Sequence, residues 1–319
     1  MQGIWLENGQ ITIKQDLVKP SLQSGQALIR TRLAGICGTD IQLLNGYYGF
    51  TGVPGHEFVG EVVDAPDKPE LIGKRVVGEI NITCGDCMQC KQNKPHHCEN
   101  RDVLGIHNHD GAFAELFTLP IQNLHLLPDD VSDEDAVFVE PLAAALRITQ
   151  QVAIAQNSRI LLIGAGKLGQ LIALVMQTLT DHLTVLTRHE NQNVLLNSEG
   201  IQTTNEKNLG SQQWDIIIEA SGSPSGIQTA LEHISPQGTI VLKSTYPKTP
   251  SVDLSRAVVN EINIIGSRCG PFQPAIALLQ SRKIIPNKLI DRQLPLSEAL
   301  LAFDYAQRPA VGKVILSFM

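Results

Sequence analysis

The chain has 319 residues, of which 43% are hydrophobic, and its 25 Lys and Arg against 32 Asp and Glu give a formal net charge of −7. This length accommodates two domains of ordinary size, and the composition is that of a globular protein. The chain lacks the basic block that neutralises nucleic-acid phosphates and the apolar run of roughly 20 residues that crosses a bilayer, so we expect neither a nucleic-acid nor a membrane partner. Since the first residues do not resemble a secretory signal, we expect a cytoplasmic protein.

The first third of the chain is rich in short apolar runs that Gly, Pro and Asp interrupt. Residues 27–30, 58–63 and 74–77 are the clearest of these runs. Runs of this length between turn-forming residues are typical of strands. We therefore predict a mostly antiparallel β domain in this part of the chain.

The pattern changes near Asp133. Ser132 followed by three acidic residues is typical of a helix N-terminus, and residues 141–146 continue with good helix formers. The sequence therefore predicts that the β domain leads into a helical segment.

From Arg159 onward, strand and helix patterns alternate. The strand patterns are short apolar runs, and a helix of residues 168–179 follows the first of them. These strands are predicted at residues 160–163, 183–186, 216–218, 239–242 and 263–266. Alternation of this kind predicts an α/β domain with a doubly wound parallel sheet. Residues 313–317 at the end of the chain predict one further strand.

Four of the six cysteines lie close together, at Cys84, Cys87, Cys90 and Cys98. In a reducing compartment disulfides are rare, and four thiolates on one short loop are typical of a structural zinc site. An iron–sulfur cluster also uses closely spaced cysteines, and four unrelated thiols are the simplest alternative. Of the three interpretations, the spacing favours zinc.

A glycine motif, Gly164-Ala165-Gly166-Lys167-Leu168-Gly169, follows the first predicted strand of the α/β domain and opens a helix. In this context its glycines allow a tight turn and a close approach of the backbone to a pyrophosphate, which the helix N-terminus attracts. The alternative is a glycine-rich turn that binds nothing. We predict dinucleotide binding by Gly164, Gly166, Lys167, Leu168 and Gly169.

Cys37, His56, Glu57 and Glu140 form a third, scattered set of residues. A catalytic zinc typically keeps three protein ligands and one open position, and these are suitable ligand types. Each also has an ordinary structural interpretation, as a small core residue, a hydrogen-bonded histidine or an acid at a helix start. The residues alone leave both interpretations open.

In chain order, these motifs resemble the zinc-containing medium-chain dehydrogenases of the alcohol dehydrogenase superfamily. The resemblance rests on Gly35-Ile36-Cys37-Gly38-Thr39-Asp40, Gly55-His56-Glu57, the four-cysteine loop, Glu140-Pro141-Leu142 and the glycine motif. It extends over nearly the whole chain. It is greatest to the branch of sorbitol, threonine and related polyol dehydrogenases, which carry Glu-Pro-Leu where other members have a zinc-binding cysteine.

The resemblance implies a fold and an assembly. Residues 1–145 and 271–319 would form a GroES-like, mostly antiparallel β catalytic domain. Residues 146–270 would form a Rossmann dinucleotide-binding domain. Members of this family are homo-oligomers, so we expect a dimer or a tetramer.

The resemblance also implies roles for the scattered residues. Cys37 and His56 would bind a catalytic zinc, with Glu57 and Glu140 as candidates for a further ligand. Thr39 would take the substrate proton, and Asp40 would orient the zinc-bound histidine. With the four-cysteine loop, the chain would hold two zinc ions.

The activity that follows is interconversion of an alcohol and a carbonyl compound, with zinc as the Lewis acid and a nicotinamide cofactor as the hydride carrier. Two alternatives share the fold, a zinc-independent quinone or enone reductase and a catalytically silent dinucleotide-binding protein. Gln42 stands where many relatives have a histidine that passes the proton to solvent, so the exit route is not carried over. Tyr47, Tyr48 and Phe50 are candidates either for a substrate pocket or for the core.

The end of the second predicted strand of the α/β domain bears on the choice of cofactor. An acid about 20 residues past the glycine motif is typical of NAD binding, whereas a nearby Arg suits the 2′-phosphate of NADP. Here the strand ends in Thr187 and Arg188, and Glu190 follows late. Thr187 can donate to a phosphate oxygen and Arg188 can form a charge-assisted contact with it. We therefore predict NADP(H) rather than NAD(H).

Overall fold

The computed structural model of the protein describes residues 1–246 and 249–318, and the chain divides into two compact units. One unit contains Met1–Glu140 and the segment that starts at Phe272, and the other is Pro141–Pro271. The predicted boundaries, after residues 145 and 270, differ from these by a few positions. The chain first passes from one unit to the other inside helix α4 (Val139–Gln151), so no loop marks this boundary in the sequence.

The first unit is built on a seven-stranded sheet in the order β10-β5-β4-β3-β18-β17, with β9 also paired to β3. Its strands are β3 (Gln26–Ile36), β4 (Glu57–Asp64), β5 (Arg75–Gly78), β9 (Leu116–Pro120), β10 (Leu124–Leu126), β17 (Ile290–Pro295) and β18 (Lys313–Ser317). All pairs are antiparallel except β17 with β18. The strands predicted at residues 27–30, 58–63, 74–77 and 313–317 are therefore confirmed.

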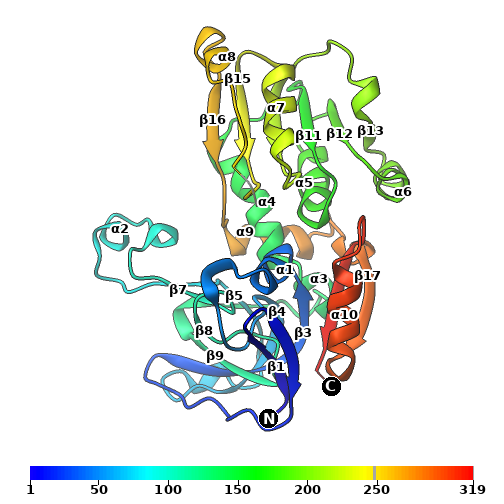
Figure 1. The fold of residues 1–319 in the computed structure, drawn as a ribbon. Coiled ribbons are helices and arrows are strands. Elements are labelled where there is room, and N and C mark those ends of the chain that lie inside the picture. Colours follow the sequence, from blue (N-terminus) through cyan, green and yellow to red (C-terminus); the bar gives the residue numbers. More distant parts are fainter. Residues whose placement is uncertain (247–248, 319) are drawn as a thin grey trace. The chain divides into compact units, whose positions relative to one another are not determined.

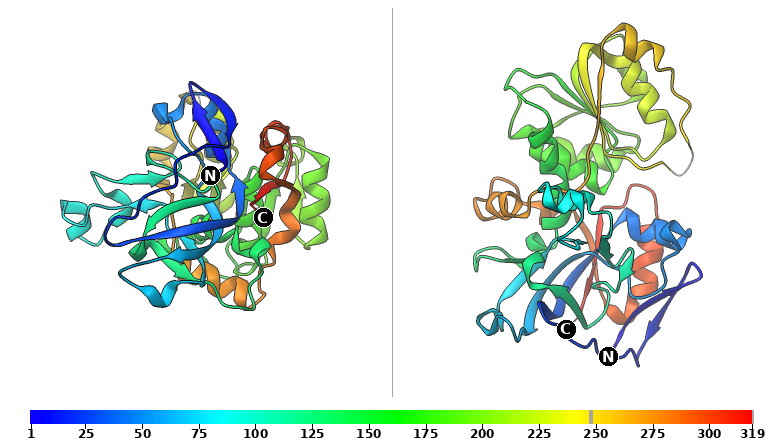
Figure 2. Two further views of the ribbon diagram at one scale, coloured as in Figure 1. Left: turned by 90° about the horizontal axis from the view of Figure 1, so that it is seen from below. Right: turned by 90° about the vertical axis from the view of Figure 1, so that its left-hand side faces the viewer.

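Smaller elements surround this sheet. They are β1 (Gly3–Glu7), β2 (Gln10–Lys14), α1 (Gly38–Leu44), β6 (Asn81–Ile82), α2 (Met88–Lys91), β7 (Asp102–Leu104), β8 (Asn108–His109), α3 (Asp133–Ala136), α9 (Phe272–Gln280) and α10 (Ala299–Ala306). The segment around α2 projects from the rest of the unit as a small lobe (Figure 1). Both ends of the chain lie on the same side of this unit (Figure 2).

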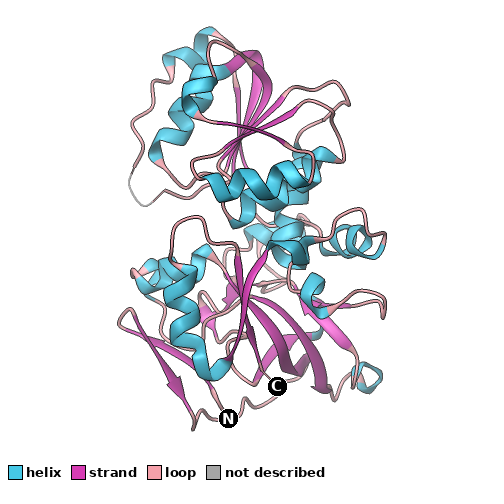
Figure 3. Cartoon of the chain, turned by 90° about the vertical axis from the view of Figure 1, so that its right-hand side faces the viewer, coloured by secondary structure: helices cyan, strands magenta, loops and turns pink. Residues whose placement is uncertain are grey.

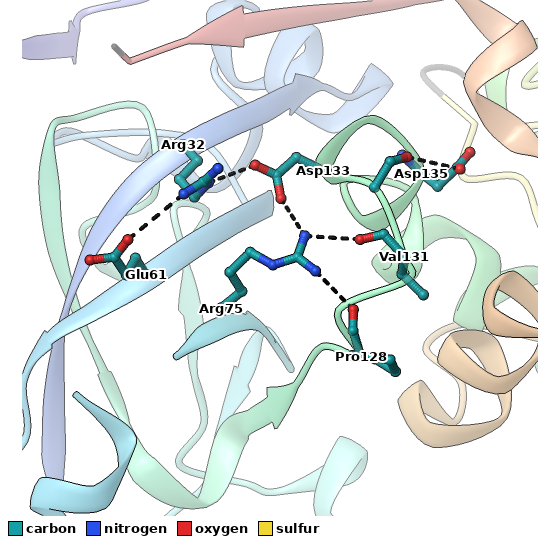
Figure 4. A network of polar contacts seen from close by, with 8 residues as sticks. Arg32, Glu61, Arg75, Pro128, Val131, Asp133 and Asp135 are labelled. Carbon is teal, nitrogen blue, oxygen red and sulfur yellow. Dashed lines mark hydrogen bonds and ion pairs between the residues drawn. The ribbon is translucent and has the colours of Figure 1, made fainter. Parts of the chain in front are cut away.

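A polar network joins the sheet of the first unit to helix α3 (Figure 4). Asp133 accepts a hydrogen bond from Arg32 Nε at 2.6 Å and another from Arg75 Nη1 at 2.8 Å. Arg75 also donates to the carbonyls of Val131 and Pro128. The predicted helix start is confirmed, because Ser132 is the N-cap and accepts from the backbone N–H of the third helical residue.

The second unit has a six-stranded, fully parallel sheet in the order β13-β12-β11-β14-β15-β16. Its strands are β11 (Ile160–Ile163), β12 (Leu183–Leu186), β13 (Gln202–Thr204), β14 (Trp214–Glu219), β15 (Ile234–Leu242) and β16 (Asn263–Gly266). Its remaining helices are α5 (Lys167–Gln177), α6 (Glu190–Ser198), α7 (Pro224–His233) and α8 (Ser255–Val259). Helices lie on both faces of the sheet (Figure 3), so β11 is wholly buried and reads as a continuous apolar run.

The strand order of this sheet reverses between β12-β11 on one side and β14 on the other. At such a switch point the connections on either side lead away in opposite directions and leave a crevice at the carboxyl ends of the strands. The turn after β11, which carries the glycine motif, therefore lies at the place where doubly wound folds bind ligands.

Candidate active site

The pairing of β3 with β4 brings the first set of site residues together. Gly35, near the end of β3, is in register with Glu57, the first residue of β4. Cys37 follows β3 directly and His56 precedes β4, so residues nearly twenty positions apart become neighbours. One ligand atom from each of Cys37, His56 and Glu57 lies within 4.8 Å of the others.

A left-handed turn delivers His56 to this position. Gly55 has φ +99°, and a Cβ there would lie 2.5 Å from the ring of Phe113, which is fully buried. Only glycine meets both demands without strain. Within the Gly-His-Glu motif, the backbone therefore requires glycine at position 55.

Asp40 connects helix α1 to the histidine. One of its carboxylate oxygens accepts from the backbone N–H of Cys37 at 2.7 Å, and the other lies 3.4 Å from His56 Nδ1. Asp40 is 1% exposed and His56 is 3% exposed. Burial alone would lower the pKa of His56, but the Asp40 carboxylate and Cys37 raise this pKa well above its ordinary value. The carboxylate therefore lies where it could orient the imidazole, the role that the resemblance implies for this position.

Thr39 lies beside the thiol of Cys37, with 3.8 Å between the hydroxyl oxygen and Sγ. Its side chain is half-buried in the first turn of α1. The hydroxyl thus stands next to the three clustered ligand atoms.

Glu57 is held by a lysine from the other end of the chain. Lys313, the first residue of β18, donates from Nζ to Glu57 Oε2, and both side chains are almost completely buried. The carboxylates of Glu57 and Glu140 and the Cys37 thiol raise the pKa of Lys313 against the lowering effect of its burial. Lys313 was not among the residues predicted from the sequence, where it is only a lysine that opens a mainly apolar strand.

Glu140 is placed near this cluster without joining it. It lies in the first turn of α4 and is close enough to Lys313 to act on its charge, but it is not among the three residues whose ligand atoms converge. A thiol, an imidazole and a buried carboxylate are suitable zinc ligands, so the residues present fit this metal.

The cysteine loop forms the second convergence. The four sulfurs lie within 4.8 Å of one another, and Cys87–Cys90, Cys87–Cys98 and Cys84–Cys98 are separated by 3.5, 3.9 and 3.5 Å. These distances are too long for disulfides and agree with the edge of about 3.8 Å of a tetrahedron whose zinc–sulfur bonds are about 2.3 Å. Backbone N–H groups of Glu99 and Cys90 lower the pKa of Cys87 to about 6. The site therefore fits zinc.

The glycine motif forms the turn between β11 and α5. Gly164 has φ +100°, and a Cβ there would lie 2.6 Å from the backbone of Ser221, in the turn that follows β14. Gly166 is the N-cap of α5, and a Cβ on it would meet open space. The first glycine is required by packing, and the second leaves room for a ligand against the first N–H groups of the helix, which include that of Lys167. This cradle fits a dinucleotide pyrophosphate.

Thr187 and Arg188 follow β12 but point to different surroundings. Thr187 is 4% exposed, and its hydroxyl donates to Asn193 Oδ1 and to the Thr204 carbonyl. In the described structure the Thr187 hydroxyl is therefore directed to its own unit. Arg188 is exposed and donates from Nη2 to Ser225 Oγ at 3.1 Å.

A cavity of about 350 Å³ lies in the first unit, lined by Tyr48–Thr51 and His107–Asp110. Tyr48 and Phe50 therefore line a cavity, whereas Tyr47 is not among its lining residues. Tyr48 has φ +58°, a strained conformation for an aromatic residue.

In the part of the chain that the structure describes, no helix is long and apolar enough to cross a membrane.

Two protein families match the chain. Residues 23–129 match the alcohol dehydrogenase GroES-like domain, and residues 155–281 match the zinc-binding dehydrogenase family. The L-threonine 3-dehydrogenase of Pseudoalteromonas translucida (strain TAC 125) is 29% identical over 340 residues, which cover 99% of this chain and 96% of that protein.

Two solved structures are similar over almost their whole length. The short chain alcohol dehydrogenase (rspB) from E. coli CFT073, complexed with NADH, has a TM-score of 0.92 at 27% identity and covers 100% of this chain and 99% of its own. A putative zinc-binding dehydrogenase from Sinorhizobium meliloti 1021, bound to NADP, has a TM-score of 0.92 at 25% identity and covers 99% of both chains.

Proposed function

Because the chain belongs to the zinc-type alcohol dehydrogenase superfamily and is a zinc-dependent oxidoreductase that uses a nicotinamide cofactor, we propose that the convergence of Cys37, His56 and Glu57 is its active site. Cys37 and His56 would hold the zinc, with a carboxylate of Glu57 or Glu140 as a further ligand. When bound there, the metal supplies a Lewis acid for the oxygen of an alcohol or carbonyl substrate.

The neighbouring side chains divide the remaining work. Thr39 Oγ1 would receive the proton that the alcohol loses on oxidation while it releases its own hydroxyl proton toward solvent, and the reverse on reduction, because its hydroxyl lies beside Cys37 of the ligand cluster. Asp40 keeps His56 in one orientation, since it is itself fixed by the backbone N–H of Cys37. Lys313 balances the buried negative charge of Glu57 and holds that carboxylate in place.

The second unit binds the cofactor. Gly164, Gly166, Lys167, Leu168 and Gly169 form the turn and first helical residues that would receive the pyrophosphate, and the bound nicotinamide would supply the hydride chemistry. Arg188 favours NADP(H) over NAD(H), since an exposed guanidinium after β12 suits a 2′-phosphate.

Two zinc ions per chain follow from the two clusters. The cysteine loop is a closed set of four sulfurs, so its metal would stabilise the lobe around α2 and take no part in the reaction.

The six thiols form no disulfide, which supports a reducing, cytoplasmic location.

Association with a second copy of this chain is supported by apolar residues on α8 and β16. Val258, Val259 and Ile264 are 76%, 79% and 39% exposed, and β16 is the last strand of its sheet. An exposed strand edge beside apolar side chains is a typical site of pairing between subunits. We therefore propose a homo-oligomer.

The observation that carries the proposed function is the convergence of Cys37, His56 and Glu57 beside Thr39. The test is cofactor-linked turnover of a panel of secondary alcohols, polyols, 3-hydroxy amino acids and their carbonyl counterparts. Activity that a chelator removes and zinc restores would support the proposal. Turnover of quinones or enones that survives complete loss of metal would contradict it.

A further inference from the structure

A series of side-chain contacts crosses the carboxyl edge of the parallel sheet in the second unit. It begins at Glu219, the last residue of β14, which is fully buried and accepts from Ser221 Oγ at 2.5 Å. Ser221 Oγ accepts from the backbone N–H of Ser223, and Ser223 Oγ lies 2.9 Å from Ser225 Oγ. Ser225 Oγ then accepts from Arg188 Nη2 at 3.1 Å.

The strand order shows what these contacts span. Arg188 follows β12, Ser225 lies in the first turn of α7 after β14, and β11 runs between those two strands. The Arg188–Ser225 contact therefore crosses the carboxyl end of β11, where the glycine turn begins. A guanidinium held there lies beside the turn that the proposed function assigns to the dinucleotide.

The chemistry of the pair leaves the arginine available to an anion. Its partner in the described structure is a neutral hydroxyl, so the positive charge of Arg188 is not neutralised by this contact. Ser225 Oγ also lies 2.9 Å from Ser223 Oγ, and either hydroxyl can donate in that contact. The Ser225 hydroxyl thus restricts a long, exposed side chain that otherwise has many rotamers, and it uses one of the five N–H groups of the guanidinium.

On the proposed NADP(H) preference, we propose that Ser225 is a positioning residue that holds Arg188 in the orientation that receives the 2′-phosphate of the cofactor. Ser223 supports Ser225 through the hydrogen bond between their hydroxyls. Neither serine lies in the glycine motif or in the zinc site.

The probes are two nucleotides, adenosine 2′,5′-bisphosphate and adenosine 5′-monophosphate, which differ only in the 2′-phosphate. Their dissociation constants are measured by calorimetry on the full-length, zinc-loaded enzyme. Ser225→Ala is expected to weaken the bisphosphate about fivefold, the loss of one hydrogen bond, and to leave the monophosphate unchanged. Ser225→Thr keeps a hydroxyl and should restore most of the affinity.

A double variant and a control test whether Ser225 acts through Arg188. In an Arg188→Ala background, Ser225→Ala should have no further effect, because the serine acts through the arginine. Ser198→Ala is the matched control, since that hydroxyl bonds to the Leu195 carbonyl in α6.

Unchanged binding of both nucleotides by Ser225→Ala, or an equal loss for both, would overturn the role of Ser225 while leaving the NADP(H) preference intact. If instead the unaltered enzyme binds both nucleotides equally and Arg188→Ala changes neither, the NADP(H) preference itself fails.

Discussion

Lys313 and Glu57 form an ion pair whose side chains are 3% and 1% exposed, although 256 positions separate them in the sequence. The pair joins β18 to β4 through the intervening strand β3. It is therefore a contact that the sheet order creates, and it lies next to the proposed catalytic ligands.

We expect Lys313→Met to destabilise the protein by about 3–5 kcal/mol, because the variant leaves the Glu57 carboxylate buried without its partner. The measurement is urea-induced unfolding of the zinc-loaded enzyme. Adding Glu57→Gln to this variant should recover part of the loss. If the free energy of unfolding of Lys313→Met lay within about 0.5 kcal/mol of that of the unaltered enzyme, Lys313 and Glu57 would not form a stabilising buried ion pair.

Replacing either of the two clearest metal ligands should remove catalysis and spare cofactor binding. Cys37→Ala and His56→Ala should reduce kcat below detection, whereas the dissociation constant of the cofactor should change less than about threefold. Cys269→Ala is the control, because that thiol belongs to neither ligand cluster. Normal turnover by Cys37→Ala would rule out the zinc mechanism.

Metal analysis should find two zinc equivalents in the unaltered enzyme. Cys90→Ser should lose one equivalent and lower the melting temperature, since a structural zinc contributes folding free energy. Glu57→Gln and Glu140→Gln, analysed in the same way, will identify the acid that binds the metal as the one whose loss weakens zinc retention during dialysis. One equivalent in the unaltered enzyme would mean that one cluster holds no metal.

The choice of cofactor can be measured as kcat/KM with NADP(H) and with NAD(H). We expect a preference for NADP(H) that Arg188→Ala reduces at least tenfold, because the 2′-phosphate loses a charge-assisted partner. Thr187→Ala should not alter this ratio, since its hydroxyl is directed to Asn193 and Thr204. An enzyme that prefers NAD(H) and is insensitive to Arg188 would contradict the assignment.

The network around Asp133 is expected to stabilise the first unit (Figure 4). Asp133→Asn should lower the free energy of unfolding by about 1–3 kcal/mol, because Arg32 and Arg75 lose a charged acceptor at a largely buried position. Asp304→Asn breaks an exposed pair with Arg308 and should cost less than about 1 kcal/mol. Equal losses of unfolding free energy in the two variants would show that the network around Asp133 stabilises the protein no more than an exposed ion pair does.

Local patterns predicted much of this structure because the forces behind them act over few residues. The four cysteines, the glycine turn after β11 and the apolar strands of the parallel sheet each carry their signal within a short window. Cys37 and His56 were identified by resemblance, and the β3–β4 register shows why residues at that spacing converge.

Other features depend on long-range pairing that no local pattern carries. Which residue of the last strand faces Glu57 depends on the register of β18 against β3, so Lys313 could not be assigned. The partners of the Thr187 hydroxyl also depend on how its neighbours pack. A hydroxyl at a strand end can face a ligand or its own domain, and the proximity of Asn193 and Thr204 decided the outcome here.

The position of β18 has a consequence for synthesis. β18 lies between β3 and β17, so the sheet of the first unit is incomplete until residues 313–317 have left the ribosome. Residues 141–271 are contiguous and are made earlier, so the dinucleotide-binding sheet has all its strands while Glu57 still lacks its counter-ion. Loss of residues 313–317 would therefore affect a sheet whose other strands are mostly made much earlier, and a nascent chain stalled near residue 310 would leave residues 33–36 of β3 unpaired on one edge.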